Sequence, residues 1–127
     1  MTEPKAEPTS EFCPDPGDCP VERTLAVIGG RWKPLILFHL RCGRRRFNEL
    51  KRRLPGVTQR MLTQHLRELE ADGVISRTVH PVVPPHVDYE YTPLGLTLLP
   101  ILDAMAAWGD RPDVRRAAAK APRPGSA

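Results

Sequence analysis

Several polar side chains in the segment 58–71 are suited to contact the edges of DNA bases. They recur at helical spacing on the face opposite three leucines, Leu62, Leu66 and Leu69. Arginine can donate two hydrogen bonds to O6 and N7 of guanine, glutamine can pair with N6 and N7 of adenine, and a threonine methyl can contact thymine. The pattern predicts base contacts, with an ordinary solvated helix face as the alternative. The candidate residues are Thr58, Gln59, Arg60, Thr63, Gln64 and Arg67.

A strongly basic stretch surrounds this segment. Residues 31–67 contain eleven arginines and lysines and a single acid, Glu49, although the whole chain has a net charge of only +4. Such a block attracts phosphate groups, whereas a basic face that serves solubility alone is the alternative interpretation. The residues expected to contact the phosphate backbone rather than bases are Arg44, Arg45, Arg46, Lys51, Arg52 and Arg53. Asn48 is a further candidate DNA contact.

Apolar residues at helical spacing, bounded by capping residues, prolines and glycines, predict five helices. The helices are expected to begin at Pro20, near Pro34, at Asn48 as an N-cap, at Thr58 as an N-cap, and at Thr92 as an N-cap. The first four should end at Gly29, Gly43, Pro55 and Gly73. The stretch 44–47, between the second and third helices, is compatible with a short strand.

Two strand-like segments follow the fourth helix. Apolar and aromatic residues at 74–79 and 87–91 flank the proline-rich sequence HPVVPPH at 80–86. Prolines cannot donate hydrogen bonds to a strand ladder, so this sequence should form the stiff tip of a hairpin. A hairpin after a helix-turn-helix is a wing, and His86 is its candidate DNA contact. The predicted fold is therefore mainly α with a small β-hairpin wing, a winged helix-turn-helix.

The last predicted helix, over 93–108 with a bend at Pro100, has more apolar surface than one small domain needs to bury. The surplus predicts a homodimer held by the terminal helices, with the first helix completing the interface through Val21, Leu25 and Ile28. The candidate interface residues are Val21, Leu25, Leu98, Leu99, Leu102, Met105 and Trp108.

Length and composition limit the organisation and location of the chain. A sequence of 127 residues matches one domain. Prolines and acids mark residues 1–18 as a flexible N-terminal tail, and further prolines mark residues 111–127 as a basic flexible C-terminal tail. Residues 19–110 between them are the predicted folded domain. No stretch is long and apolar enough to span a bilayer, no signal peptide is recognisable, and three cysteines are too few for a secreted disulfide scaffold. A cytoplasmic protein with no membrane association is expected.

Enzymatic and metal chemistry find little support in the sequence. No combination of nucleophile, base and carboxylate and no glycine-rich phosphate loop is present, so the chain is not expected to be an enzyme or to need a cofactor. No metal site is expected either. The histidines His39, His65, His80 and His86 do not stand at the spacing of metal ligands, and the cysteines lack a CxxC pair.

Seven blocks in order along the chain resemble the HxlR-type, MarR-like winged-helix transcriptional regulators. The blocks are CPVE at 19–22, IGGRWKPLIL at 28–37, RFNEL at 46–50, QRMLTQ at 59–64, LRELEADG at 66–73, YTPLG at 91–95 and WG at 108–109. The resemblance implies a homodimer that binds double-stranded operator DNA and represses or activates nearby genes. It also implies that the helix after Thr58 is the recognition helix.

Cys19 is a candidate redox sensor. It directly precedes a helix N-terminus, where backbone N–H groups and the helix dipole favour a thiolate. The resemblance implies that a cysteine at this place can sense a small electrophile or oxidant; an inert, partly buried cysteine is the alternative. Cys13 is a candidate resolving thiol, and Cys42 is expected to be a plain helix-end residue.

We therefore predict a sequence-specific DNA-binding transcriptional repressor that recognises a pseudo-palindromic operator as a homodimer. Two functions from other classes are the alternatives. One is a winged-helix protein-interaction module without DNA recognition, and the other is a small thiol redox protein.

Overall fold

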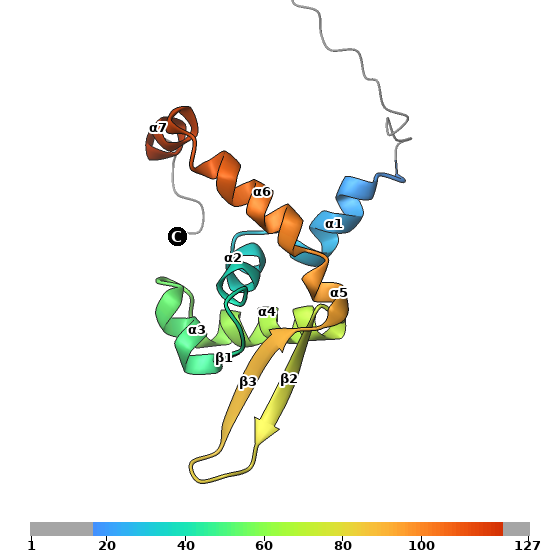
Figure 1. Ribbon diagram of the computed structural model, residues 1–127, viewed down its shortest axis with the longest axis vertical. Helices are drawn as coiled ribbons and strands as arrows, with labels where there is room; N and C mark the ends of the chain where they lie inside the picture. The colour runs from blue at the N-terminus through green and yellow to red at the C-terminus, as the bar shows by residue number, and fades with distance from the viewer. Residues whose placement is uncertain (1–16, 121–127) are drawn as a thin grey trace, which may run out of the picture.

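The structure is a computed structural model that describes residues 17–120, and it confirms a mainly helical winged helix-turn-helix. Seven helices and three short strands follow one another along these residues (Figure 1). Their bounds are α1 Pro20–Ile28, α2 Trp32–His39, β1 Arg45–Arg46, α3 Phe47–Arg53, α4 Gln59–Ala71, β2 Ile75–His80, β3 His86–Tyr91, α5 Pro93–Leu96, α6 Leu99–Gly109 and α7 Pro112–Lys120.

Helix α2 lies at the centre of the core, as its largely apolar sequence requires. Ile36 and Leu37 are fully buried, and α2 packs against α3, α4 and α6. The hydroxyl of Tyr91, at the end of β3, donates a hydrogen bond to the carbonyl of Leu37. Burial raises the pKa of Tyr91, which keeps this hydroxyl protonated as a donor. The helix therefore connects the sheet to the rest of the core.

The fourth helix has the predicted ends and the predicted buried face. The Thr58 hydroxyl accepts a hydrogen bond of 3.0 Å from the backbone N–H of Met61, and Gly73 terminates the helix region with a φ of +80°. The three leucines of α4 are buried, which leaves its other face to solvent: Leu62, Leu66 and Leu69.

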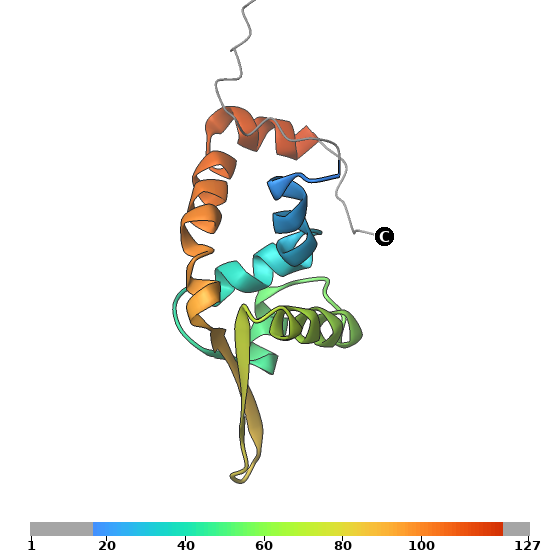
Figure 2. The same ribbon diagram turned by 90° about the vertical axis from the view of Figure 1, so that its right-hand side faces the viewer.

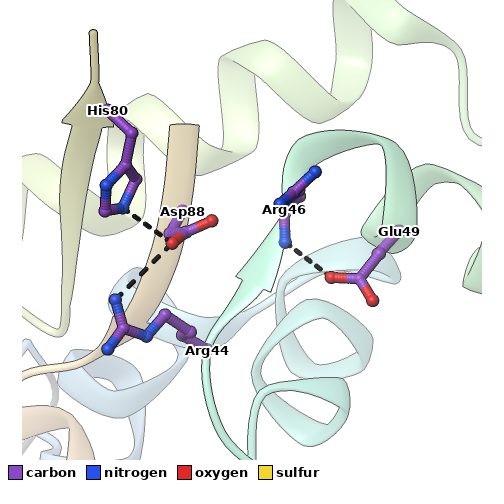
Figure 3. Close-up of polar contacts among 5 residues, drawn as sticks. All are labelled: Arg44, Arg46, Glu49, His80 and Asp88. Carbon is purple, nitrogen blue, oxygen red and sulfur yellow. Dashed lines mark hydrogen bonds and ion pairs between the residues drawn. The ribbon is translucent and has the colours of Figure 1, made fainter. Parts of the chain in front are cut away.

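Helix α3 begins two residues earlier than its predicted N-cap Asn48 would allow. Arg46 is the N-cap, and its backbone N–H donates a 2.9 Å hydrogen bond to the Glu49 carboxylate (Figure 3). Arg45 and Arg46 form β1, which pairs with β3, so the chain turns into the helix directly after the strand. Asn48 is instead an exposed residue of the first helical turn.

The predicted wing is present as the antiparallel hairpin of β2 and β3. The sheet order is β1-β3-β2, and the ladder between β2 and β3 runs from the pair Ile75 and Tyr91 to the pair His80 and His86. Residues 81–85 lie beyond the last pair and form the tip, as the prolines require.

The predicted single helix over 93–108 is wrong: the structure has two helices, α5 and α6. Pro100 lies in the first turn of α6, where its missing N–H leaves no hydrogen bond unmade, so it starts a helix rather than bending one. Gly95 in α5 packs so closely on the connection between α4 and β2 that an added Cβ would lie 2.0 Å from the Val74 carbonyl oxygen. This contact requires glycine at position 95.

A helix also occupies part of the predicted C-terminal tail. Helix α7 has Pro112 at its start, Asp113 in the first turn and Lys120 in the last, all favourable placements for an α-helix. The sequence analysis assigned this segment to a flexible tail because it is basic and has few large apolar residues. Residues 1–16 and 121–127, which include most of the predicted N-terminal tail and Cys13, lie outside the described residues.

The helices near the two ends of the described chain lie away from the wing. Helices α1, α6 and α7 occupy the end of the molecule opposite the β2–β3 hairpin, with α2 and α4 between (Figures 1 and 2). Among residues 17–120, no helix combines the length and apolar character needed to cross a bilayer.

Candidate nucleic-acid interface

The solvent-facing side of α4 carries the predicted base-contacting residues. Thr63 is partly buried and the other five are exposed, so the structure brings the whole predicted set to one face and leaves it accessible: Thr58, Gln59, Arg60, Thr63, Gln64 and Arg67. The side chains of this face carry donors and acceptors that suit the major groove.

One residue of this face is held by a network that reaches α2. The Gln64 amide donates a 2.7 Å hydrogen bond to one oxygen of Glu68, and Lys33 pairs with the other oxygen at 2.7 Å. The hydrogen bond from Lys33, followed by that from Gln64, lowers the pKa of Glu68. The Lys33 side chain is only 12% exposed, so the network ties α4 to the core helix.

A hollow of about 440 Å³ lies between α4 and the wing. It is lined by Phe47, Gln59, Thr63, Arg67, Glu70, Arg77 and Tyr89. Arg77 is an exposed residue of β2 that the sequence analysis did not select. The sequence could have identified Arg77 as a candidate DNA contact, because it is the one charged residue in the first strand of the predicted wing, 74–79.

A second hollow, of about 690 Å³, lies between α3 and the tip of the wing. Its lining includes four of the predicted DNA contacts, three close together in sequence and one from the wing: Arg46, Asn48, Arg52 and His86. Glu49 also lines it, and the hydrogen bond from the Arg46 backbone lowers the pKa of this carboxyl. The structure thus places the predicted phosphate contacts of α3 beside the wing.

Arg45 has a different environment from its basic neighbours. Its side chain is 16% exposed, and its Nε donates a 2.8 Å hydrogen bond to the carbonyl of His39. Burial, and then the charges of Arg53 and Arg45, lower the pKa of His39. Arg45 therefore holds the junction between α2 and β1, a structural role that differs from the expected phosphate contact. Lys51 is partly buried, whereas Arg44, Arg46, Arg52 and Arg53 are exposed.

The residues predicted for a dimer interface divide into two groups. Val21 and Leu25 on α1 and Met105 and Trp108 on α6 are exposed, with Val21 62% and Trp108 64% accessible. We call these four side chains, together with Ile101, the apolar surface. Leu98, Leu102 and Ile28 are buried in the core, and Leu102 is 2% exposed, so their assignment to an interface is wrong. Helical spacing does not distinguish a side chain that faces its own core from one that faces a partner. Leu99 is partly buried.

Cys19 is the N-cap residue of α1 and is partly exposed. Its carbonyl accepts a 3.0 Å hydrogen bond from the Glu22 backbone, and its side chain makes no capping hydrogen bond. The thiol is thus placed at the helix N-terminus as predicted. Cys42 lies in the turn after α2 and is exposed.

Two of the histidines do come together, contrary to the expectation from their spacing. His80 and His86 are the last facing pair of the hairpin, and their ring centroids are 4.6 Å apart. His80 Nε2 lies 2.8 Å from Oδ2 of Asp88, and Arg44 Nη1 lies 3.6 Å from the same oxygen (Figure 3). The register of a hairpin, rather than spacing along the chain, decides which side chains meet.

A helix-turn-helix with a polar exposed face on α4, followed by a three-stranded sheet with an extended hairpin, defines the winged-helix class of DNA-binding regulators. Comparison of the sequence with known protein families identifies the family. The chain belongs to the HxlR-like helix-turn-helix family, whose sequence model matches residues 27–115.

Several relatives are closely similar over most of the chain. The HTH-type transcriptional regulator YdeP of Bacillus subtilis (strain 168) is 53% identical over 107 residues, which cover 81% of this chain and 84% of YdeP. The structure of the redox regulator HypR in its oxidized form has a TM-score of 0.70 and 54% identity, and covers 72% of this chain and 95% of HypR. The reduced transcriptional regulator YodB from B. subtilis has a TM-score of 0.64 and 36% identity, with coverage of 73% and 92%. The class is therefore transcriptional regulator, and regulators of this kind are generally not enzymes.

Proposed function

We propose that this chain is a repressor that binds a pseudo-palindromic operator in double-stranded DNA as a homodimer. The observation that carries the proposal is the exposed polar face of α4, with the wing beside it. Helix α4 enters the major groove, where Arg60 and Gln64 contact base edges. The basic residues of α3 and the wing contact the flanking phosphates. Repression follows when the operator overlaps a promoter.

The apolar surface supports the homodimer. Its side chains lie on α1 and α6 at the end of the molecule opposite the wing, so pairing there leaves both α4 helices free for DNA (Figure 2). A two-fold dimer places its recognition helices in successive major grooves, roughly 10 base pairs apart.

The salt dependence of DNA binding tests this function against a protein-interaction module. If the dimer neutralises about six phosphates, the logarithm of the association constant should fall with the logarithm of salt concentration with a slope near −5. Fluorescence anisotropy with operator and random duplexes measures both slopes. A module without DNA recognition would give no difference in affinity between the two duplexes.

Cys19 is proposed as the sensor of a small electrophile or oxidant. Its thiol is partly exposed at the N-terminus of α1, and α1 carries part of the apolar surface, so a modified sulfur lies close to the proposed dimer interface. Two similar proteins, the redox regulator HypR and the diamide-treated YodB, are consistent with thiol chemistry in this family.

Replacement of the thiol tests the sensor. Cys19→Ser should bind operator DNA like the wild type but keep binding after treatment with diamide, whereas the wild type should be released. Cys42→Ser is the matched control and should respond like the wild type. A diamide response that survives in Cys19→Ser would refute the assignment.

A further inference from the structure

The outer end of the wing gathers two imidazoles and one carboxylate. His80 and His86 face each other in the last pair of the ladder, and Asp88 lies two residues further along β3, on the same side of the strand as His86. The possible ligand atoms of the three residues all lie within 4.8 Å of one another. Two strands of one hairpin therefore present three potential ligands to a common point.

The distances are close to those of a metal site. In a tetrahedral zinc site with bonds of about 2.0–2.2 Å, neighbouring ligand atoms lie roughly 3.4 Å apart. His80 Nε2 and Asp88 Oδ2 are already 2.8 Å apart. A bound cation would replace this hydrogen bond, so the pair would separate slightly while the other ligand atoms move closer, and rotation of the half-buried imidazoles at the end of the hairpin allows both movements.

The burial of the carboxylate supports the same site. The Asp88 side chain is largely buried, Arg44 Nη1 lies 3.6 Å from its Oδ2, and His80 Nε2 is hydrogen-bonded to the same oxygen. A buried carboxylate beside two imidazoles favours a cation at this point. Mixed imidazole and carboxylate ligands suit zinc and neighbouring divalent transition metals, and three protein ligands leave a fourth position for water.

We propose that His80, His86 and Asp88 bind a divalent transition-metal cation of the zinc type at the outer end of the wing. The cation joins β2 to β3 at the last pair of the ladder, where the proline-rich tip begins. It also compensates the charge of Asp88, which releases the exposed Arg44 guanidinium to contact a DNA phosphate. The wing then binds DNA more strongly when the metal is present.

Cobalt(II) is the probe for the site, titrated into the full chain with its cysteines kept reduced. We expect saturable binding of one ion per chain, with visible ligand-field bands and no thiolate-to-cobalt charge-transfer band in the near ultraviolet. His80→Gln and His86→Gln should each weaken binding by at least about tenfold. His65→Gln on α4 is the matched histidine control and should bind like the wild type.

Three results would overturn the site: no saturable binding, a thiolate charge-transfer band, or equal binding by wild type and His86→Gln. His86 lies at the end of the hairpin outside the core, and circular dichroism checks that its variant folds. The titration uses no DNA, so its result does not depend on the proposed function.

The effect on Arg44 rests on the proposed function and has its own experiment. Adding Zn²⁺ should steepen the salt slope of DNA binding by roughly one unit in the wild type, the signature of one added phosphate contact. Arg44→Ala should show no such change. A zinc effect of equal size in Arg44→Ala would refute the release of this residue even if the metal site is real.

Discussion

The two ends of the molecule expose opposite kinds of surface. At one end, α3 and the outer face of α4 expose arginines and amides over a core of buried leucines. At the other end, α1 and α6 expose Val21, Leu25, Met105 and Trp108. A charged surface is stable in water without a partner, whereas a group of large exposed apolar side chains marks an interaction site.

The difference indicates a division of tasks. Polar groups lose little when they exchange water for the hydrated grooves of DNA, and their directional hydrogen bonds distinguish sequences. Apolar groups supply affinity without much direction and suit a permanent contact between copies of one chain. The same small fold can therefore bind two partners without competition between them.

The largest effect is expected from a charge placed on the apolar surface. Met105→Glu should give monomers, because a carboxylate in a dimer interface loses its water without gaining a partner. Operator affinity should fall on the order of 100-fold or more, since the second half-site acts through effective concentration. Analytical ultracentrifugation and anisotropy measure the two losses.

Two other substitutions on α6 make this result specific. Ala107→Glu, exposed on the opposite side of the helix from Met105, should remain dimeric. Leu102→Glu should lower the thermal midpoint of the protein itself, because Leu102 is buried in the core. A dimeric Met105→Glu that binds operator normally would remove the proposed role of the apolar surface.

A smaller effect is expected at the base-contacting residues. Arg60→Ala and Gln64→Ala should each lose about 1–3 kcal/mol of discrimination between operator and random DNA, because they remove hydrogen bonds to base edges. Arg52→Ala, beside the wing, should weaken binding to both duplexes equally. Parallel losses on both duplexes for Arg60→Ala and Gln64→Ala would make them phosphate contacts instead.

The smallest effect concerns the network behind α4. Hydrogen bonds from Lys33 and Gln64 lower the pKa of Glu68 in the folded protein. The ionised carboxylate therefore stabilises the fold fully at pH values above the ordinary pKa of a glutamate, about 4.3. This stabilisation is lost as the pH falls through the lower pKa of the folded state. Glu68→Gln should therefore be less stable than the wild type at pH 7. The difference should be smaller at an acidic pH below that ordinary value, because the Glu68 carboxyl becomes protonated there and loses its advantage over the amide. Urea unfolding at the two pH values measures it, and a difference of equal size in acid would have another cause.

Local signals in the sequence were sufficient for α4 and the wing. Thr58 and Gly73 are residues whose chemistry defines helix ends, and the leucines of α4 could face only the core once the helix was placed. The prolines of the tip likewise fixed where the two strands of the hairpin end, because proline cannot donate a hydrogen bond to the ladder. The exposed set on α4 could be predicted because a helix with one apolar face leaves the other to solvent.

Features set by tertiary contacts could not be predicted in this way. The pairing of β1 with β3 moved the start of α3 away from Asn48, and the meeting of His80, His86 and Asp88 depends on the hairpin register. Leu102 and Met105 are neighbours in the same apolar pattern, yet one is buried and the other exposed. Periodicity identifies an apolar side but not which neighbour covers each part of it.

Helix α2 is ion-paired to a different helix near each of its ends. Lys33, near its start, pairs with Glu68 of α4, and Arg41, just after its end, pairs with Asp103 of α6 at 2.8 Å. In the proposed dimer, a rotation of α6 would therefore reach α4 through α2 and these two ion pairs. If modification of the thiol at position 19 shifts that rotation, thermodynamic linkage makes the coupling reciprocal. Bound operator would then change the modification equilibrium of the thiol by the same factor by which modification changes operator affinity.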